Sequence, residues 1–191
     1  MGQLRIIAGE LGGRRIRVPR GQTVRPTPDR VREALFDILG PTLAGTAALD
    51  LYAGSGALGL EALSRGACRA TFVEADDRAR SVLSQNVEDL GVGPRCTIVA
   101  GGVETVVERG ILGGPFDLVL ADPPYDERSG ETLLCAVARA GLVGPGARIV
   151  LQRDHRTEAA RGEGTPFDPV RTARYGRTSL DFYVFSEDSG K

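Results

Sequence analysis

A glycine-rich turn between an apolar run and a helical stretch constrains the fold more than any other feature of the chain. Residues 47–52 (AALDLY) read as a buried strand and lead directly into Gly54, Gly56 and Gly59, which have the spacing G-x-G-x-x-G. Glycine lets the backbone turn tightly and approach a ligand closely, and the helix that follows presents free N–H groups to it. The spacing predicts a strand–loop–helix unit with a ligand site at the loop.

Strand-like runs and helical patterns alternate from this point onward. Further strands are predicted at residues 69–75, 96–100, 116–121 and 147–152, with helical patterns between them. This alternation is typical of an α/β fold with a doubly wound, Rossmann-like sheet, in which ligands bind beyond the carboxyl ends of the strands. The helical rhythm then ends, because residues 161–169 are polar and rich in Gly and Pro. Residues 179–185 (SLDFYVF) read as a final strand, so we expect antiparallel strands to close the sheet.

An acidic residue follows the second predicted strand of this series. Glu74 stands 20 residues after Gly54, at the carboxyl end of that strand. A carboxylate there can accept hydrogen bonds from both ribose hydroxyls of an adenosine-containing cofactor. NAD and S-adenosylmethionine share this ribose. The glycine loop and Glu74 therefore predict an adenosyl cofactor without choosing between a dehydrogenase and a methyltransferase.

A stiff polar loop at the end of the run 116–121 favours the methyltransferase. Its residues are Asp122, Pro123, Pro124 and Tyr125. Two consecutive prolines fix φ and remove both backbone donors, so the surrounding carbonyls stay available. The Asp122 carboxylate and the Pro123 carbonyl could accept both hydrogens of an exocyclic amine, while the Tyr125 ring offers a stacking face for a nucleobase. We expect these four residues to form the acceptor side of a catalytic site that methylates a base nitrogen.

Several longer strings carry a family resemblance that spans nearly the whole chain. They are 5–9 (RIIAG), 12–15 (GGRR), 25–27 (RPT), 29–36 (DRVREALF), 50–62 (DLYAGSGALGLEA), the Asp122 loop and Tyr175-Gly176. In these strings the chain resembles the bacterial 16S ribosomal RNA guanine-N2 methyltransferases of the RsmD type. The resemblance implies a class I fold that uses S-adenosylmethionine and methylates the exocyclic N2 of one guanine in 16S ribosomal RNA, within an assembling small subunit. Two alternatives remain open: adenine-N6 methylation of DNA or RNA, and a non-catalytic RNA-binding assembly factor.

The expected cofactor site follows the carboxyl ends of four predicted strands. Many proteins of this fold have an acidic residue directly after the third strand, where it meets the adenine amino group. Here that place holds Gly101-Gly102, so we expect backbone groups near Gly102 to recognise adenine. The residues expected to contact the cofactor are Asp50, Tyr52, Ala53, Gly54, Ser55, Gly56, Glu74, Ala75, Gly102, Val103 and Asp122.

Positive charge is concentrated at the amino-terminal end, although the formal net charge is only −1. Residues 1–32 contain eight arginines and two acidic residues, a local balance of +6. Arginine makes bidentate contacts with phosphate and stacks on bases, so this segment predicts an RNA-binding surface. The residues expected to contact RNA are Arg14, Arg15, Arg17, Arg20, Arg25, Thr27, Arg30 and Arg32.

The same end of the chain predicts a small extension of a single catalytic domain. Residues 4–8 and 14–18 flank a Gly-rich turn and read as a β-hairpin, followed by a helix whose apolar face contains Val31 and Leu35. Arg30 and Arg32 fall off that face and should meet solvent or RNA. We therefore expect a basic extension over 1–40, a methyltransferase domain over 41–185 and a flexible tail over 186–191.

The remaining composition bounds the cellular context. Cys68, Cys96 and Cys135 lie far apart without a C-x-x-C pair, which predicts buried free thiols and argues against a zinc site or a disulfide framework. No apolar run reaches the roughly 20 residues of a membrane span, and no signal peptide is evident. We expect a cytoplasmic monomer that binds neither metal nor membrane.

Overall fold

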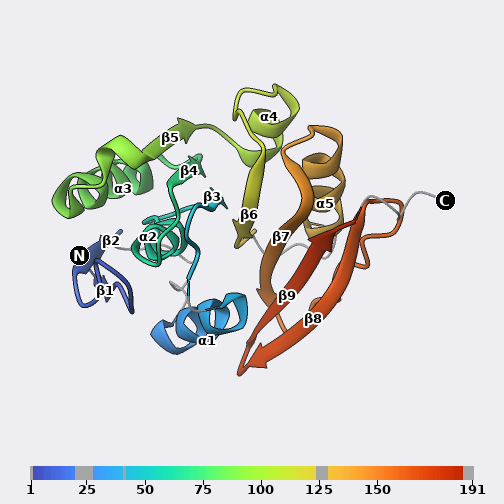
Figure 1. Ribbon diagram of the computed structural model, residues 1–191, viewed down its shortest axis with the longest axis horizontal. Helices are drawn as coiled ribbons and strands as arrows, with labels where there is room; N and C mark the ends of the chain where they lie inside the picture. Colours follow the sequence, from blue (N-terminus) through green and yellow to red (C-terminus); the bar gives the residue numbers. More distant parts are fainter. Residues whose placement is uncertain (1, 20–27, 41, 124–128, 187–191) are drawn as a thin grey trace.

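The computed structural model describes residues 2–19, 28–40, 42–123 and 129–186, and its centre is a seven-stranded sheet (Figure 1). The strand order is β5-β4-β3-β6-β7-β9-β8. All neighbouring strands are parallel except that β9 runs antiparallel to both β7 and β8. The strands are β3 (Ala47–Leu51), β4 (Arg69–Glu74), β5 (Cys96–Ala100), β6 (Phe116–Ala121), β7 (Val143–Asp154), β8 (Phe167–Tyr175) and β9 (Thr178–Phe185). The predicted doubly wound α/β sheet is confirmed.

Helices cover both faces of this sheet, and each face has its own apolar core. One core joins the sheet to α1, α2 and α3, while the other joins it to α4 and α5. Successive strand residues point to opposite faces, so Leu118 and Leu120 enter the first core and Val119 enters the second. The helices are α1 (Asp29–Leu39), α2 (Ala57–Ser64), α3 (Asp77–Leu90), α4 (Val103–Glu108) and α5 (Ser129–Arg139), with a 3-10 turn η1 (Gly93–Arg95) before β5.

Strand β8 is the element that the sequence did not locate. It begins at Phe167, within the stretch that reads as polar and rich in Gly and Pro, and it includes Pro169. Proline cannot donate a ladder hydrogen bond, and the register with β9 shifts between Pro169 and Arg171. Because β8 is the outermost strand, only one of its sides needs a partner. A strand with a weak sequence pattern is tolerated there.

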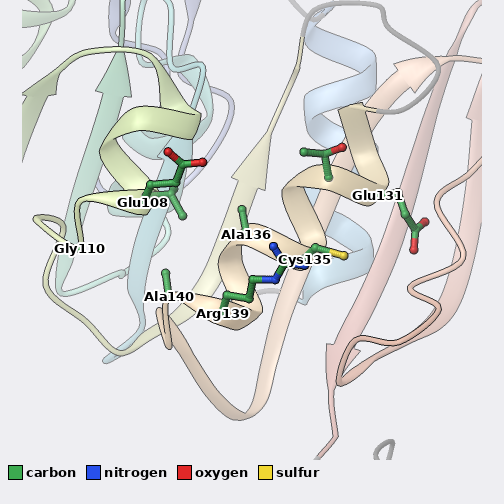
Figure 2. A pocket seen from close by; sticks show the side chains of 9 residues that line it. Glu108, Gly110, Glu131, Cys135, Ala136, Arg139 and Ala140 are labelled. Carbon is green, nitrogen blue, oxygen red and sulfur yellow. The ribbon is translucent and has the colours of Figure 1, made fainter.

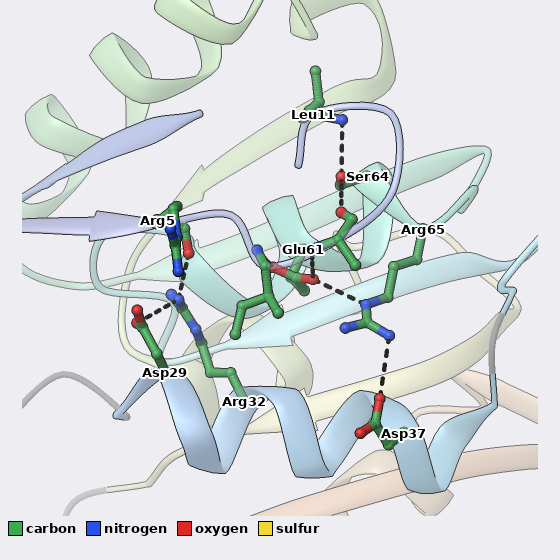
Figure 3. Close-up of polar contacts among 10 residues, drawn as sticks. Arg5, Leu11, Asp29, Arg32, Asp37, Glu61, Ser64 and Arg65 are labelled. Carbon is green, nitrogen blue, oxygen red and sulfur yellow. Dashed lines mark hydrogen bonds and ion pairs between the residues drawn. The ribbon is translucent and has the colours of Figure 1, made fainter. Parts of the chain in front are cut away.

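The amino-terminal hairpin forms a separate two-stranded sheet and docks on the helices beside the main sheet. Strands β1 (Gly2–Arg5) and β2 (Arg15–Val18) pair antiparallel, as predicted. The connecting segment rests on α2 through two buried side chains (Figure 3). The Glu61 carboxylate accepts the N–H groups of Ile7 at 2.7 Å and Ala8 at 3.1 Å. The Ser64 hydroxyl accepts the N–H of Leu11 at 3.0 Å and donates to the carbonyl of Ala8. We refer to residues 2–19 as the arm.

Arg32 does not meet solvent, and the expectation that it contacts RNA from an exposed face of α1 is wrong. Its side chain is fully buried, and its Nη2 donates to the Arg5 carbonyl at 2.6 Å and to the Asp29 carboxylate at 2.9 Å (Figure 3). Burial lowers the pKa of Arg32, while the charges of Asp29 and Glu61 raise it. Arg32 therefore shares the buried face of α1 with Leu35 and Phe36, and the arm covers its end of that face.

The three cysteines are free thiols, but the prediction that they are buried is wrong. Cys68 is exposed, whereas Cys96 and Cys135 are partly buried. Within the described ranges, no helix is long and apolar enough to cross a bilayer. The same ranges contain no group of three or more His, Cys, Asp or Glu side chains arranged to hold a metal ion.

Candidate active site

The glycine loop between β3 and α2 owes its shape to three glycines with different physical roles. Gly54 has φ 55° and nothing within 4 Å of the place where a Cβ would stand, so this side of the loop is open. Gly56 has φ 79°, and a Cβ there would lie 2.3 Å from the Leu83 side chain. A Cβ at Gly59 would lie 2.3 Å from Phe72. Gly56 therefore permits close packing of the loop on α3, Gly59 permits close packing of α2 on β4, and Gly54 leaves room for a ligand.

Glu74 is connected to this loop by its own carboxylate. Its Oε2 accepts the N–H of Gly54 at 2.7 Å, and its Oε1 accepts the N–H of Asp76 at 2.8 Å. Each carboxylate oxygen has a second lone pair, so these bonds leave acceptor capacity for two hydroxyl groups. Glu74 thus orders the loop and can also receive a ribose.

A buried carboxylate lies directly beneath the loop. Asp50, in β3, is only 2% exposed, and its Oδ2 accepts the N–H of Gly59 at 2.8 Å. Burial raises the pKa of Asp50 to about 8, the Gly59 bond lowers it, and the charges of Glu74 and Asp122 raise it further. Glu74 of β4, Asp50 of β3 and Asp122 after β6 stand at or near the carboxyl ends of three adjacent strands.

We predict that the free energy of unfolding of the ligand-free protein decreases between pH 6 and pH 9 and that Asp50 causes part of the decrease. In the unfolded chain Asp50 has its ordinary pKa of 3.8 and is ionised at pH 6. In the folded protein its pKa is raised to about 8, so it still holds its proton at that pH. The folded form loses its proton only as the pH passes about 8, at the cost of burying a charge. Asp50→Asn should reduce the decrease by about 2–3 kcal/mol, most of it below pH 8, measured by urea denaturation at several pH values. Glu108→Gln, at an exposed position, is the control; identical pH slopes for wild type and Asp50→Asn would contradict the prediction.

Asp122 follows β6 and lies beside the end of β7. Ala121 pairs with Leu151, so Asp122 stands next to Gln152. Burial raises the pKa of Asp122 to about 7, and a hydrogen bond with the Gln152 side chain lowers it. Asp122 is half-buried and Pro123 is buried, whereas Pro124 and Tyr125 lie outside the described residues. A carboxylate with this pKa can hold a proton or release it near neutral pH.

The expected adenine end of the site contains an acidic residue that the sequence analysis did not identify. Glu104 lies in the first turn of α4, two residues after the N-cap Gly102. Its Oε1 accepts a hydrogen bond from the Tyr52 hydroxyl at 2.7 Å. Tyr52 has φ 60°, a backbone conformation that residues other than glycine rarely adopt. Such residues cluster at functional sites. Burial and the Glu104 bond both raise the pKa of Tyr52, so its hydroxyl stays protonated and donates.

The structure brings the expected cofactor residues together at one edge of the sheet. They follow or end β3 (Asp50, Tyr52, Ala53, Gly54, Ser55, Gly56), β4 (Glu74, Ala75), β5 (Gly102, Val103) and β6 (Asp122). Their contact with a cofactor remains a prediction. The position of Glu104 in the first turn of α4, on a helix that is otherwise mostly apolar, was the signal that could have identified it.

The expected RNA residues are more dispersed. Arg14, Arg15 and Arg30 are exposed. Arg14 also donates to the Asp89 carbonyl at 2.6 Å, and Arg17 forms an ion pair with the Asp89 carboxylate at 2.6 Å. Arg20, Arg25 and Thr27 lie outside the described residues. Part of the positive charge of the arm therefore attaches it to α3.

A hollow of about 750 Å³ lies between α4 and α5 (Figure 2). It is lined by Val107, Glu108, Gly110, Glu131, Thr132, Cys135, Ala136, Arg139 and Ala140. None of these residues belongs to the predicted site.

Comparisons with known proteins identify the family. The family described as Conserved hypothetical protein 95 matches residues 4–184. Ribosomal RNA small subunit methyltransferase D of Haemophilus influenzae is 35% identical over 158 residues, which cover 80% of each chain. The chain belongs to the RsmD family. The Escherichia coli protein of the same name is 42% identical over 124 residues, which cover 65% of this chain and 61% of that member of the RsmD family.

Solved structures agree with this assignment. The structure of Escherichia coli yhhF has a TM-score of 0.86 and 33% identity, and the match covers 97% of this chain and 99% of that one. An RNA methyltransferase from Salinibacter ruber, solved with S-adenosyl-L-homocysteine, has a TM-score of 0.66 at 16% identity and covers 86% of this chain and 95% of that one. The second likeness concerns the fold alone, and it is the methyltransferase fold expected of an RsmD family member.

Proposed function

We propose that the protein transfers a methyl group from S-adenosylmethionine to the exocyclic N2 of one guanine in 16S ribosomal RNA. We further propose that it acts as a cytoplasmic monomer on an assembling small subunit. The observation that carries the proposal is the meeting of the glycine loop, Glu74 and Asp122 at one edge of the sheet, in a chain of the RsmD family. A donor loop and an acceptor loop on the same edge are what direct methyl transfer requires.

The residues present fit the proposed cofactor. The open side of Gly54 leaves space for it, the spare lone pairs of Glu74 can accept its ribose hydroxyls, and Glu104 offers an acidic group near the adenine end. The Glu74 carboxylate also favours a positively charged ligand at this edge. When bound, S-adenosylmethionine supplies the methyl group on a cationic sulfur.

The acceptor loop supplies position more than proton chemistry. The lone pair of the guanine amine is delocalised into the ring, which makes the amine a poor nucleophile. Accepting hydrogen bonds from both amine hydrogens, by the Asp122 carboxylate and the Pro123 carbonyl, favours a geometry in which the lone pair can attack. The proton leaves after the bond has formed, either to Asp122 or to water. Tyr125 would stack on the base.

The arm, the arginines that follow it and Arg30 of α1 are the proposed RNA surface. Exposed Arg14, Arg15 and Arg30 can contact phosphate, and Arg20 and Arg25 add charge in the neighbouring segment. Phosphate contacts of this kind orient an RNA without reading its sequence. If the target guanine is stacked in a helix, it must be unstacked first, at a cost of a few kcal/mol.

Methyl transfer to isolated RNA and to particles tests the proposal. The protein is incubated with S-adenosylmethionine carrying a labelled methyl group and with either 16S ribosomal RNA or immature small subunits from cells that lack the protein. Nucleosides are then separated by mass spectrometry. We expect label in N2-methylguanosine. Cofactor binding without incorporation into either substrate would instead support a non-catalytic assembly factor.

Adenine-N6 methylation is the second candidate, because the Asp122 loop could hold the adenine amine equally well. One relative supports it: a tRNA1(Val) (adenine(37)-N6)-methyltransferase from Shewanella is 33% identical over 92 residues, which cover 48% of this chain and 39% of that protein. Label in N6-methyladenosine in the same experiment would establish this alternative.

A further inference from the structure

A single buried amide side chain joins the arm to the glycine loop. Asn86 lies in α3 and is 1% exposed. Its Oδ1 accepts the N–H of Arg17 at 2.8 Å, and its Nδ2 donates to the carbonyl of the same residue at 2.9 Å. The same Nδ2 donates to the carbonyl of Ser55 at 3.0 Å. An amide nitrogen has two hydrogens, so both donors of Asn86 are used, one in the arm and one in the loop.

The Ser55 end of this connection lies at the turn of the loop. Ser55 is 7% exposed and stands between Gly54 and Gly56, both of which have positive φ. The carbonyl of Ser55 and the N–H of Gly56 belong to one planar peptide unit and point in opposite directions. Holding the carbonyl on Asn86 therefore orients the Gly56 N–H, which donates to the Ala53 carbonyl at 2.7 Å. The conformation of the cofactor loop depends on this peptide plane.

The Arg17 end belongs to β2, which carries the charge of the proposed RNA surface. Asn86 satisfies both backbone groups of Arg17 in the way that a neighbouring strand would. One turn along α3, Asp89 holds the Arg17 guanidinium. If the arm left this place, Asn86 would lose two of its three hydrogen bonds inside the protein. A buried polar group without partners is unfavourable, so the position of the arm and the order of the loop depend on the same side chain.

We propose that Asn86 is a positioning residue that couples the arm to the cofactor loop, so that RNA bound to the arm and cofactor bound to the loop strengthen each other. This inference rests on the proposed function. Coupling between two sites is reciprocal. The factor by which the docked arm strengthens cofactor binding equals the factor by which bound cofactor favours the docked arm. Cofactor alone therefore reveals the coupling, and no RNA is needed to test it.

Hydrogen–deuterium exchange of the full chain tests the coupling, with and without saturating S-adenosylmethionine. In the wild type, the cofactor should slow exchange of the β2 amides about fivefold or more. In Asn86→Ala, the cofactor should still bind, as measured by calorimetry, but exchange of the β2 amides should no longer respond to it. Ser64→Ala is the matched control, because Ser64 holds the arm on α2 without contacting the loop; there the response should persist. An unresponsive β2 in the wild type, or an equal response in Asn86→Ala, would overturn the proposal.

The ligand-free proteins separate this inference from the proposed function. Asn86→Ala should speed exchange of both the β2 amides and the loop amides at residues 53–56, whereas Ser64→Ala, which leaves the Asn86 hydrogen bonds in place, should speed exchange only at residues 8–11 beside Ser64. Equal loop rates in the two variants would overturn the coupling even if the cofactor did not bind at all. If Asn86→Ala does not fold, Asn86→Ser is measured in its place. Serine keeps a hydroxyl that can donate or accept one hydrogen bond, whereas alanine keeps no polar group. Failure of methyl transfer to RNA, with the exchange results as expected, would refute only the substrate.

Discussion

Replacing Asp122 with alanine is expected to lower methyl transfer about 100-fold or more while leaving the affinity for S-adenosylmethionine largely intact. The variant loses the carboxylate that the proposal assigns to the acceptor amine. The glycine loop and Glu74 keep their mutual hydrogen bond, because that bond joins the Gly54 N–H to the Glu74 carboxylate and does not involve Asp122. Turnover with a labelled methyl donor and calorimetric titration with the cofactor measure the two quantities separately.

The pH dependence of the wild type and an asparagine variant sharpen this expectation. The pKa of Asp122 is raised to about 7 by burial, so the ionised acceptor form increases as the pH rises through 7. Turnover should rise over the same range and level off above it. Asp122→Asn has nearly the same size without the charge, and its residual turnover should not show this rise. Wild-type turnover in Asp122→Ala would refute the role assigned to the residue.

Replacing Glu61 with alanine is expected to lower the free energy of unfolding by about 3–5 kcal/mol. Glu61 is fully buried, and its carboxylate accepts hydrogen bonds from the N–H groups of Ile7 and Ala8 and from Arg65 Nε at 2.9 Å (Figure 3). Its removal would leave these partly buried donors without their acceptor and would also remove an opposite charge near Arg32. Urea denaturation followed by circular dichroism measures the change.

Two further variants show whether the effect belongs to the buried charge. Glu61→Gln keeps an acceptor oxygen and should be less destabilising than Glu61→Ala. Ser64→Ala removes hydrogen bonds from the same docked segment without removing a charge, and we expect a loss of about 1–2 kcal/mol. A loss below about 1 kcal/mol for Glu61→Ala would mean that the arm is held mainly by apolar contacts, such as those of Ile6 and Ile16.

The sequence predicted the parts of the fold that rest on local pattern. The buried parallel strands appear as short apolar runs, and the glycine spacing gained weight because a predicted strand precedes it and Glu74 follows 20 residues after Gly54. Strand β8 was missed because an edge strand with Pro169 lacks both signals. The closure of the sheet was predicted, but the location of this strand was not.

The errors in the candidate site arise from contacts between distant parts of the chain. The assignment of Arg32 to a face of α1 away from the apolar residues is wrong, because Arg32 stands one turn before Leu35 and Phe36 on the buried face, where the docked arm accepts its hydrogen bond. Glu61 and Asn86 are polar helix residues that a pattern assigns to solvent, yet each is buried against the arm, more than 50 residues away. Glu104 is a further example, because its hydrogen-bond partner Tyr52 is 52 residues away in the sequence. Such pairs depend on the assembled fold.

The outer strand β8 also influences how the molecule meets other extended chains. An open sheet edge offers a row of unused donors and acceptors on which a foreign strand can assemble. Here Pro169 offers no N–H, the ladder slips between Pro169 and Arg171, and Arg171 and Arg174 extend their charges into solvent. A strand of another chain that approached β8 would meet an interrupted row of backbone hydrogen-bonding groups flanked by Arg171 and Arg174. We therefore expect this border of the protein to pair poorly with a strand of another chain.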